Sequence, residues 1–304
     1  MLSRIAESLF WIGRYLERAE DTCRILEMHL QLLIDDPSVD QEDAAAALLS
    51  VMGAPSVDEN PDVLSLLCYD PASPASVAWV LDGAREAARR ARETVSSEMW
   101  EAINTTWNSV RGGRLQRMRP ASAFRLVRER CAVITGTADQ TMSHDEGWQF
   151  LTVGRSLERV DMTARLISTA QAAGTATAWS NVLRGCGAHH AFVRSYGGVT
   201  TDRDAAEFVL LDRLFPRSVV HNLRAAEGAL RQLDLSASTR GYEDEAVRLL
   251  GAARAGLEYR EPNRMLEELP QRMADLQRTC STVSEAVTAR YFAGSAAASW
   301  TGGN

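Results

Sequence analysis

Apolar residues recur every three or four positions along most of the chain, which is the spacing of one face of an α-helix. The longest stripe begins at Leu9, continues to Leu33 and ends where Asp35-Asp36-Pro37 interrupts it. The same spacing predicts further helices over 40–52, 60–69, 74–108, 120–142, 144–173, 178–196, 203–212, 215–233 and 264–292. Since no run of alternating β-branched residues stands out, the sequence predicts an all-α protein.

Two parts of the chain carry similar strings of residues. The string GRYLERAEDTCR at 13–24 resembles GRSLERVDMTAR at 154–165, which lies 141 residues later. An offset of 142 residues then pairs Asp70, Pro74, Ser76, Val77, Leu81, Trp100-Glu101 and Pro120 with Asp212, Pro216, Ser218, Val219, Leu223, Tyr242-Glu243 and Pro262. An offset that stays nearly constant over this length indicates a tandem duplication of a large unit and not a solenoid of short repeats.

The duplication predicts the domain organisation. We expect two helical repeats, residues 1–142 and 143–293, that pack into one compact helical body about a pseudo-twofold axis, with Arg14 superposing on Arg155. We expect the remaining residues, 294–304, to form a disordered tail.

Composition narrows the possible chemistry. All 33 basic residues are arginine, which excludes Schiff-base catalysis and a phosphate-loop lysine. The formal net charge of −7 argues against nucleic acid or an anionic membrane as a partner. The five cysteines are widely spaced and include no C-x-x-C pair, so we expect reduced, packed thiols in a cytoplasmic protein. No stretch of about 18 apolar residues predicts a membrane span, and no motif predicts a metal or a cofactor.

Charged residues of the repeated string lie on or beside one helix face, opposite the leucine stripe. Gly13 and Gly154 begin the two strips; because glycine inside a helix costs about 1 kcal/mol relative to alanine, they indicate close approach of another backbone. Apolar Phe10, Ile25 and Met28 at the edges of the face predict a helix packed on both sides. The strips consist of Arg14, Glu17, Arg18, Glu20 and Arg24 in the first copy, and Arg155, Glu158, Arg159, Asp161 and Arg165 in the second.

Two interpretations fit these strips. In the first, which we favour, they form a structural ion network whose arginines bridge carboxylates of both copies. In the second, they line a cleft where arginines hold a carboxylate or phosphate and a glutamate holds an amine or acts as a base. Arg217 could reach the same cleft. If the strips face each other, Glu17 and Glu158 should be buried and paired with arginine.

Other motifs are less specific. The adjacent His189 and His190 point about 100° apart on a helix and lack further ligands, so packing histidines are favoured over a metal site. The segment 111–119 predicts an exposed basic turn, for which an acidic partner or a phosphate is the functional alternative. Its arginines, which surround Gly112-Gly113, are Arg111, Arg114, Arg117 and Arg119.

The sequence resembles the bacterial Alpha-E family, helical proteins named for a Glu-Arg motif. The resemblance covers nearly the whole chain and rests on LSR at 2–4, FWIGRYLERAE at 10–20, WEAIN at 100–104 and FPRSV at 215–219. It places the motif at Glu17-Arg18 and, through the repeat, at Glu158-Arg159. Members of the family occur fused to, or encoded beside, a circularly permuted ATP-grasp ligase, often with transglutaminase-like proteins. The resemblance therefore implies a component of an amide-forming or peptide-modifying system.

The expected function follows from this resemblance and from the residues. We expect an accessory protein that binds a peptide, an acidic ligand or the ligase itself, with the ATP-grasp ligase on a separate polypeptide. No nucleophile elbow, phosphate loop or metal spacing supports autonomous catalysis. Two alternatives stay open: an enzyme that uses the duplicated Glu-Arg strip for acid-base or acyl-transfer chemistry, and a scaffold without a ligand.

Overall fold

The computed structural model describes residues 1–54, 61–172, 178–197, 201–233, 244–259 and 266–292. Within these ranges the chain is helical and contains no strand, so the all-α prediction is confirmed. The elements are α1 (Ser3–Asp35), α2 (Gln41–Met52), the π-helical turn η1 (Ser65–Tyr69), α3 (Val77–Arg90), α4 (Ser97–Val110), the 3₁₀ turn η2 (Leu115–Arg117), α5 (Pro120–Thr141), α6 (Glu146–Ala172), α7 (Ala178–Gly185), α8 (His189–Tyr196), α9 (Asp202–Leu211), α10 (Val219–Leu233), α11 (Glu245–Glu258) and α12 (Leu269–Tyr291).

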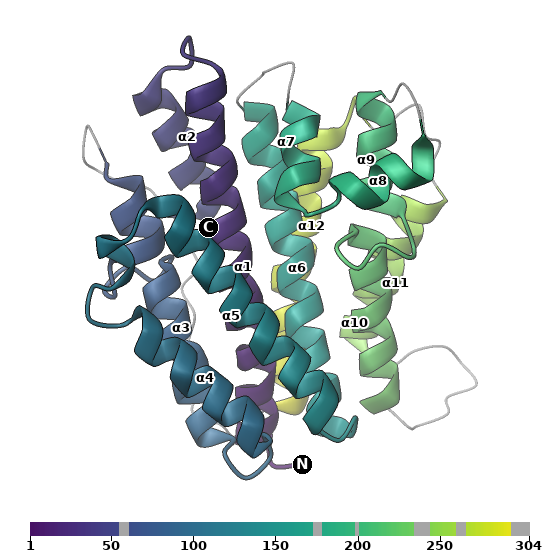
Figure 1. Cartoon of the computed structure of the whole chain (residues 1–304). Coiled ribbons are helices and arrows are strands. Elements are labelled where there is room, and N and C mark those ends of the chain that lie inside the picture. The colour runs from purple at the N-terminus through teal and green to yellow at the C-terminus, as the bar shows by residue number, and fades with distance from the viewer. Residues whose placement is uncertain (55–60, 173–177, 198–200, 234–243, 260–265, 293–304) are drawn as a thin grey trace.

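The long helices α1 and α6 lie side by side at the centre of the molecule and run in the same direction (Figure 1). Helices α3 and α5 pack on α1, and α4 joins them on that flank; α10 and α12 pack on α6, and α11 joins them on the other flank. The short helix α2, which follows α1, contacts α6, while α7, which follows α6, contacts α1. The central pair is therefore covered on both sides.

Glycine allows the close contact between α1 and α6. A Cβ atom on Gly13 would lie 2.8 Å from the Arg155 backbone nitrogen and closer still to the carbonyl oxygen of Leu151. A Cβ on Gly154 would lie 2.9 Å from the Phe10 carbonyl carbon and would overlap its oxygen. The predicted approach of another backbone at these two glycines is confirmed.

The entries to α3 and α10 are built in the same way. Ser76 accepts a hydrogen bond from the backbone of Trp79 and donates one to the carbonyl of Asp70. Ser218 accepts from the backbone of His221 and donates to the carbonyl of Asp212. Each serine satisfies a free N–H at a helix N-terminus and also fixes the preceding turn.

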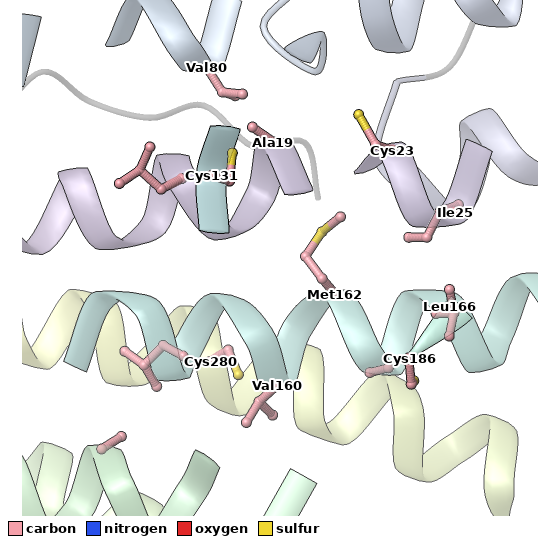
Figure 2. Packing of buried hydrophobic residues seen from close by; sticks show 14 of the residues in the cluster. Ala19, Cys23, Ile25, Val80, Cys131, Val160, Met162, Leu166, Cys186 and Cys280 are labelled. Carbon is pink, nitrogen blue, oxygen red and sulfur yellow. The ribbon is translucent and has the colours of Figure 1, made fainter. Parts of the chain in front are cut away.

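Apolar side chains from both flanks meet on the central pair, as Figure 2 shows for Ile25 and Met162. All five cysteines are buried and free, which confirms the expectation of packed thiols. Burial raises the pKa of the Cys186 thiol to about 12, so it is a poor nucleophile at neutral pH.

Three helix predictions were wrong. The single helix expected over 74–108 is α3 and α4, because the chain turns after Arg90 and Ser96 caps a new helix by accepting from the backbone of Met99. The helix expected over 178–196 is α7 and α8, separated at Gly187, whose φ of 65° is left-handed. The periodicity missed α11, which begins after the capping residue Asp244. The proposed counterparts at 242–243 and 262, and the predicted tail 294–304, lie outside the described residues.

Candidate functional site

The charged strips of α1 and α6 face each other inside the protein. Glu158 is 0% exposed, Glu17 is 3% exposed and Arg14 is 7% exposed. Since each glutamate also pairs with arginines, the expectation for a shared interface is confirmed. The pairs form two groups, one around each glutamate.

The Glu158 cluster consists of Arg14, Arg18, Glu158, Asp161 and Arg165. The Nε atoms of Arg14 and Arg18 donate to separate oxygens of Glu158, at 2.6 and 2.5 Å. Arg14 also donates to the hydroxyl of Ser284 on α12. Asp161 lies one turn further along α6 and accepts from Arg165 Nε at 2.8 Å. Two arginines from α1 thus hold the one glutamate from α6.

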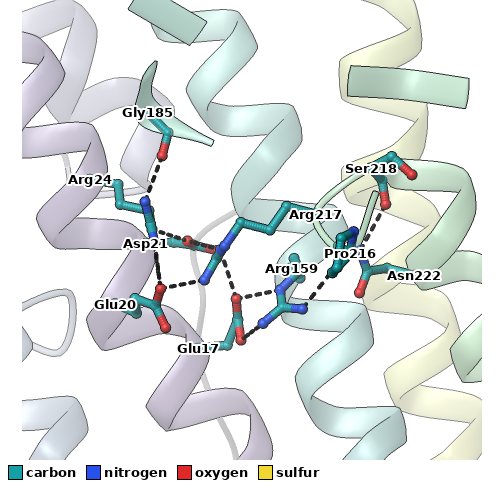
Figure 3. Close-up of polar contacts among 10 residues, drawn as sticks. All are labelled: Glu17, Glu20, Asp21, Arg24, Arg159, Gly185, Pro216, Arg217, Ser218 and Asn222. Atoms are coloured by element: carbon teal, nitrogen blue, oxygen red, sulfur yellow. Dashed lines mark hydrogen bonds and ion pairs between the residues drawn. The ribbon is translucent and has the colours of Figure 1, made fainter. Parts of the chain in front are cut away.

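The Glu17 cluster consists of Glu17, Glu20, Asp21, Arg24, Arg159 and Arg217 (Figure 3). Arg159 binds Glu17 with both arms of its guanidinium group, at 2.5 and 2.6 Å. Arg217, from the turn before α10, lies 3.0 Å from Glu17 Oε1 and 2.6 Å from Asp21 Oδ1, and it also pairs with Glu20. A residue far along the chain therefore ties the second flank to α1.

Equivalent arginines close the ends of the two short helices. Arg24 pairs with Glu20 and donates to the carbonyl of Gly185, the last residue of α7, at 3.2 Å. Arg165 pairs with Asp161 and donates to the carbonyl of Val51, near the end of α2. Each guanidinium satisfies a carbonyl that the helix itself leaves free.

Both motif glutamates are held as carboxylates. Burial by itself would raise the pKa of Glu17, but Arg159 and Arg217 outweigh it and lower the pKa to about 2. The pKa of Glu158 is also lowered, because Arg18 and Arg14 outweigh the effect of burial. A carboxylate with so low a pKa is a weak base, and its oxygens are occupied by guanidinium groups. The geometry suits an interhelical ion network better than acid-base catalysis.

Asp21 behaves differently from the two glutamates. Burial raises its pKa to about 7, and the nearby carboxylates of Glu17 and Glu20 add to the rise, although Arg217 and Arg24 oppose it. Its Oδ2 atom is buried and has no hydrogen-bond partner in the described part of the chain. Asp21 borders a cavity of only about 10 Å³, which is room for water and not for a substrate. We placed Asp21 on the charged face but did not include it among the candidate residues, since spacing alone does not reveal a raised pKa.

Arg155 is the one candidate residue that joins neither cluster. Within the described ranges it makes no ion pair, and its guanidinium carbon lies 5.8 Å from the centre of the Trp148 ring. Burial lowers the pKa of Arg155, with a further contribution from the charge of Arg159. The structure brings together the other ten candidates, Arg217 included.

A family model now accounts for these contacts. The model for Alpha-E, described as a predicted alpha-helical domain with a conserved ER motif, matches residues 1–292. The chain belongs to the Alpha-E family. In this Alpha-E chain the two Glu-Arg pairs bind each other crosswise, since Glu17 pairs with Arg159 and Glu158 pairs with Arg18.

Curated relatives of this Alpha-E chain come from mycobacteria. Uncharacterized protein Mb2597 of Mycobacterium bovis and uncharacterized protein Rv2567 of Mycobacterium tuberculosis are each 23% identical to it, over 95% of this chain and 37% of the relative. The chain thus spans a little over a third of the length of these relatives. No solved structure matches it.

The remaining sequence motifs lie at the surface. His189 and His190 are exposed, and no group of three or more potential ligands among the described residues is placed to hold a metal ion. None of the described helices has the length and apolar character to cross a membrane. The arginines of the basic turn, Arg111, Arg114, Arg117 and Arg119, are all exposed and make no ion pair within the described ranges.

Proposed function

We propose that this chain is a non-catalytic, cytoplasmic partner of an amide-forming or peptide-modifying system built on a circularly permuted ATP-grasp ligase. The observation that carries the proposal is the crosswise pairing of the Glu-Arg motifs. Because Glu17 and Glu158 are buried and bound by arginines on both oxygens, the motif acts as a lock between α1 and α6. A protein organised around such a lock is better suited to binding than to turnover.

The length of the relatives supports a role beside another protein. In the mycobacterial proteins the matched region is 37% of the chain, so the helical unit is joined there to further sequence. Fusion to a functional partner would serve the same purpose as association of separate chains, since it raises the effective concentration of one module near the other. A transglutaminase-like protein is a second partner that the family resemblance implies.

We further propose that residues 1–142 and 143–293 are tandem-duplicated halves about a pseudo-twofold axis. Three correspondences support this. The motif pairs are reciprocal, Arg24 and Arg165 cap equivalent short helices, and Ser76 and Ser218 make equivalent hydrogen bonds. The order of the flanking helices supports it as well, because α3, α4 and α5 pack around α1 as α10, α11 and α12 pack around α6.

The basic turn at 111–119 is the surface we propose for docking the ligase. Four exposed arginines lie within nine residues, and none of them is neutralised by a described carboxylate. Such a cluster attracts an acidic surface and accelerates association, and salt weakens the attraction because exposed charges are screened over about 8 Å at physiological ionic strength.

A reconstituted assay tests this function. The purified ligase should form its amide product and consume ATP much faster with the chain than without it, and the chain alone should be inactive. The double variant Arg114→Gln, Arg117→Gln should raise the concentration needed for half-maximal stimulation at least about tenfold. The matched control Arg248→Gln removes an exposed arginine of α11 and should change nothing.

Two outcomes of this assay contradict the proposal. Unchanged ligase turnover over a wide range of chain concentrations would remove the partnership. Turnover by the purified chain alone, abolished in folded Glu17→Gln and Glu158→Gln variants, would establish the enzyme alternative instead.

A further inference from the structure

A groove opens between α1, α5 and α7 beside the Glu17 cluster. It encloses about 300 Å³, which lies at the lower end of the size range of small-molecule sites. Arg24 and Gly185, joined by the hydrogen bond drawn in Figure 3, line this groove and also the smaller cavity next to Asp21. The floor of the groove is therefore fixed by the ion network.

Arginines dominate the charge of the groove. Arg24, Arg128 and Arg184 line it, against a single carboxylate, that of Glu27. Arg128 pairs with Glu27 at 2.7 Å, and Arg24 pairs with Glu20, so these two side chains are held in place. Arg184 is exposed and makes no ion pair in the described part of the chain. Its donors are available to a ligand, and the charge of the lining favours an anion.

A buried amide in the same groove points independently to a ligand. Asn181 lines the groove and is only 6% exposed. Its side chain makes no hydrogen bond with any described residue. Buried amide groups nearly always have hydrogen-bond partners, so this one is expected to meet a polar group that enters the groove. Asn181 lies one helical turn from Gly185 and three residues from Arg184, on the wall that faces Arg24.

We propose that this groove binds a small carboxylate-bearing molecule of amino-acid or short-peptide size. The planar guanidinium of Arg184 matches a carboxylate with two parallel hydrogen bonds, and Asn181 can donate to the same ligand or accept from its amide. Glu27 can accept from a ligand ammonium group, whereas it would repel the second charge of a phosphate. The oxyanion site stands on the geometry alone; the choice of an amino acid or peptide as carrier rests on the proposed amide-forming role.

Calorimetric titration of the full chain tests the groove without any ligase. The probes are L-glutamate, a dipeptide ending in glutamate, and inorganic phosphate. Glutamate or the dipeptide should bind at one site, and Arg184→Gln should weaken that binding at least about tenfold. The matched control is Arg194→Gln, which removes an exposed arginine from the last turn of α8, outside the groove, and should leave binding unchanged.

A second variant separates ligand binding from folding. Asn181→Leu keeps the approximate shape of the side chain and removes the amide. It should weaken binding of the carboxylate probe while raising the melting temperature of the free chain, because a buried polar group without a partner is lost. A purely structural Asn181 would give the opposite change in melting temperature.

Three results would overturn the inference. The site is absent if neither carboxylate probe binds at millimolar concentration. The carboxylate assignment is wrong if phosphate binds as tightly as glutamate and displaces it. The location is wrong if Arg194→Gln weakens binding as much as Arg184→Gln. Each of these results leaves the ligase assay intact, since that assay depends on the turn at 111–119 and not on the groove.

Discussion

The Glu158 cluster and the Glu17 cluster use the same motif but obtain their second arginine from different places. Glu158 is bound by Arg14 and Arg18, both from α1. Glu17 is bound by Arg159 from α6 and by Arg217 from the turn before α10. Arg155, which corresponds to Arg14 in the repeated string, makes no ion pair in the described structure. The Glu17 cluster has thus replaced a local arginine by a distant one.

The replacement changes the charge and the reach of the network. Arg217 corresponds to Ala75 in the first half, and Asp21 corresponds to Met162 in the second, so this ion pair has no counterpart around Glu158. One cluster joins the central helices to each other. The other also ties α1 to the turn that leads into α10, and the basic groove opens beside it. The same lock therefore has a purely structural copy and a copy that borders a candidate ligand site.

The largest difference between the clusters should appear when each glutamate is neutralised. Glu158→Gln leaves Arg14 without a carboxylate partner and should lower the free energy of unfolding by about 3–5 kcal/mol. Glu17→Gln should cost less, about 1–3 kcal/mol, because Arg217 retains Glu20 and Asp21. Urea denaturation of both variants measures the difference. Equal losses would mean that Arg217 does not compensate.

The glycine crossing tests whether both clusters depend on the same spacing of α1 and α6. Gly154→Ala places a Cβ against the Phe10 carbonyl and should cost about 3 kcal/mol, since neither backbone can yield without separating the helices. Gly136→Ala is the matched control. It lies in α5 with open space around it and should gain about 0.5–1 kcal/mol from helix propensity. A loss below about 1 kcal/mol for Gly154→Ala would show that the two helices can be moved apart cheaply.

The sequence predicted the parts of this comparison that local spacing determines. Helical periodicity placed Glu17 and Glu158 on one face, and the cost of glycine in a helix located the crossing of α1 and α6. Periodicity did not locate the turn between α3 and α4, because Ser96 ends one apolar stripe and starts another without glycine or proline. It also gave no indication of Asn181 or of the groove.

The groove escaped prediction for a physical reason. Arg24, Arg128 and Arg184 come from three helices, and their convergence depends on packing that no spacing within one helix encodes. The unpaired state of Arg155 has the same origin. Its string is nearly identical to that around Arg14, and only the presence of Arg217 beside Glu17 distinguishes the two sites.

The added pair of the Glu17 cluster should behave as a coupled unit. Arg217→Met leaves the buried carboxylate of Asp21 without its 2.6 Å partner, and Asp21→Asn should relieve much of that loss. In a double-mutant cycle we expect a coupling energy of about 2 kcal/mol, measured by urea denaturation of the four proteins. Additive losses, within about 0.5 kcal/mol, would contradict a direct ion pair.

The smallest effect should be a dependence of stability on pH that comes from Asp21. Its pKa is raised to about 7 in the folded chain, whereas an unfolded aspartate titrates near 3.8. The folded state therefore holds this proton to higher pH than the unfolded state does, and the stability it contributes is complete below about pH 3.8 and lost as the pH rises through 7. Between pH 6 and pH 8, the free energy of unfolding of the unmodified chain should fall by about 1 kcal/mol more than that of Asp21→Asn. Glu17 does not contribute in this window, because its pKa is lowered to about 2 and its stabilising effect is lost only as the pH falls below about 4.5. Parallel stability curves for the two proteins would show that Asp21 is ionised throughout this range, and the Glu17 cluster would then differ from the Glu158 cluster in geometry alone.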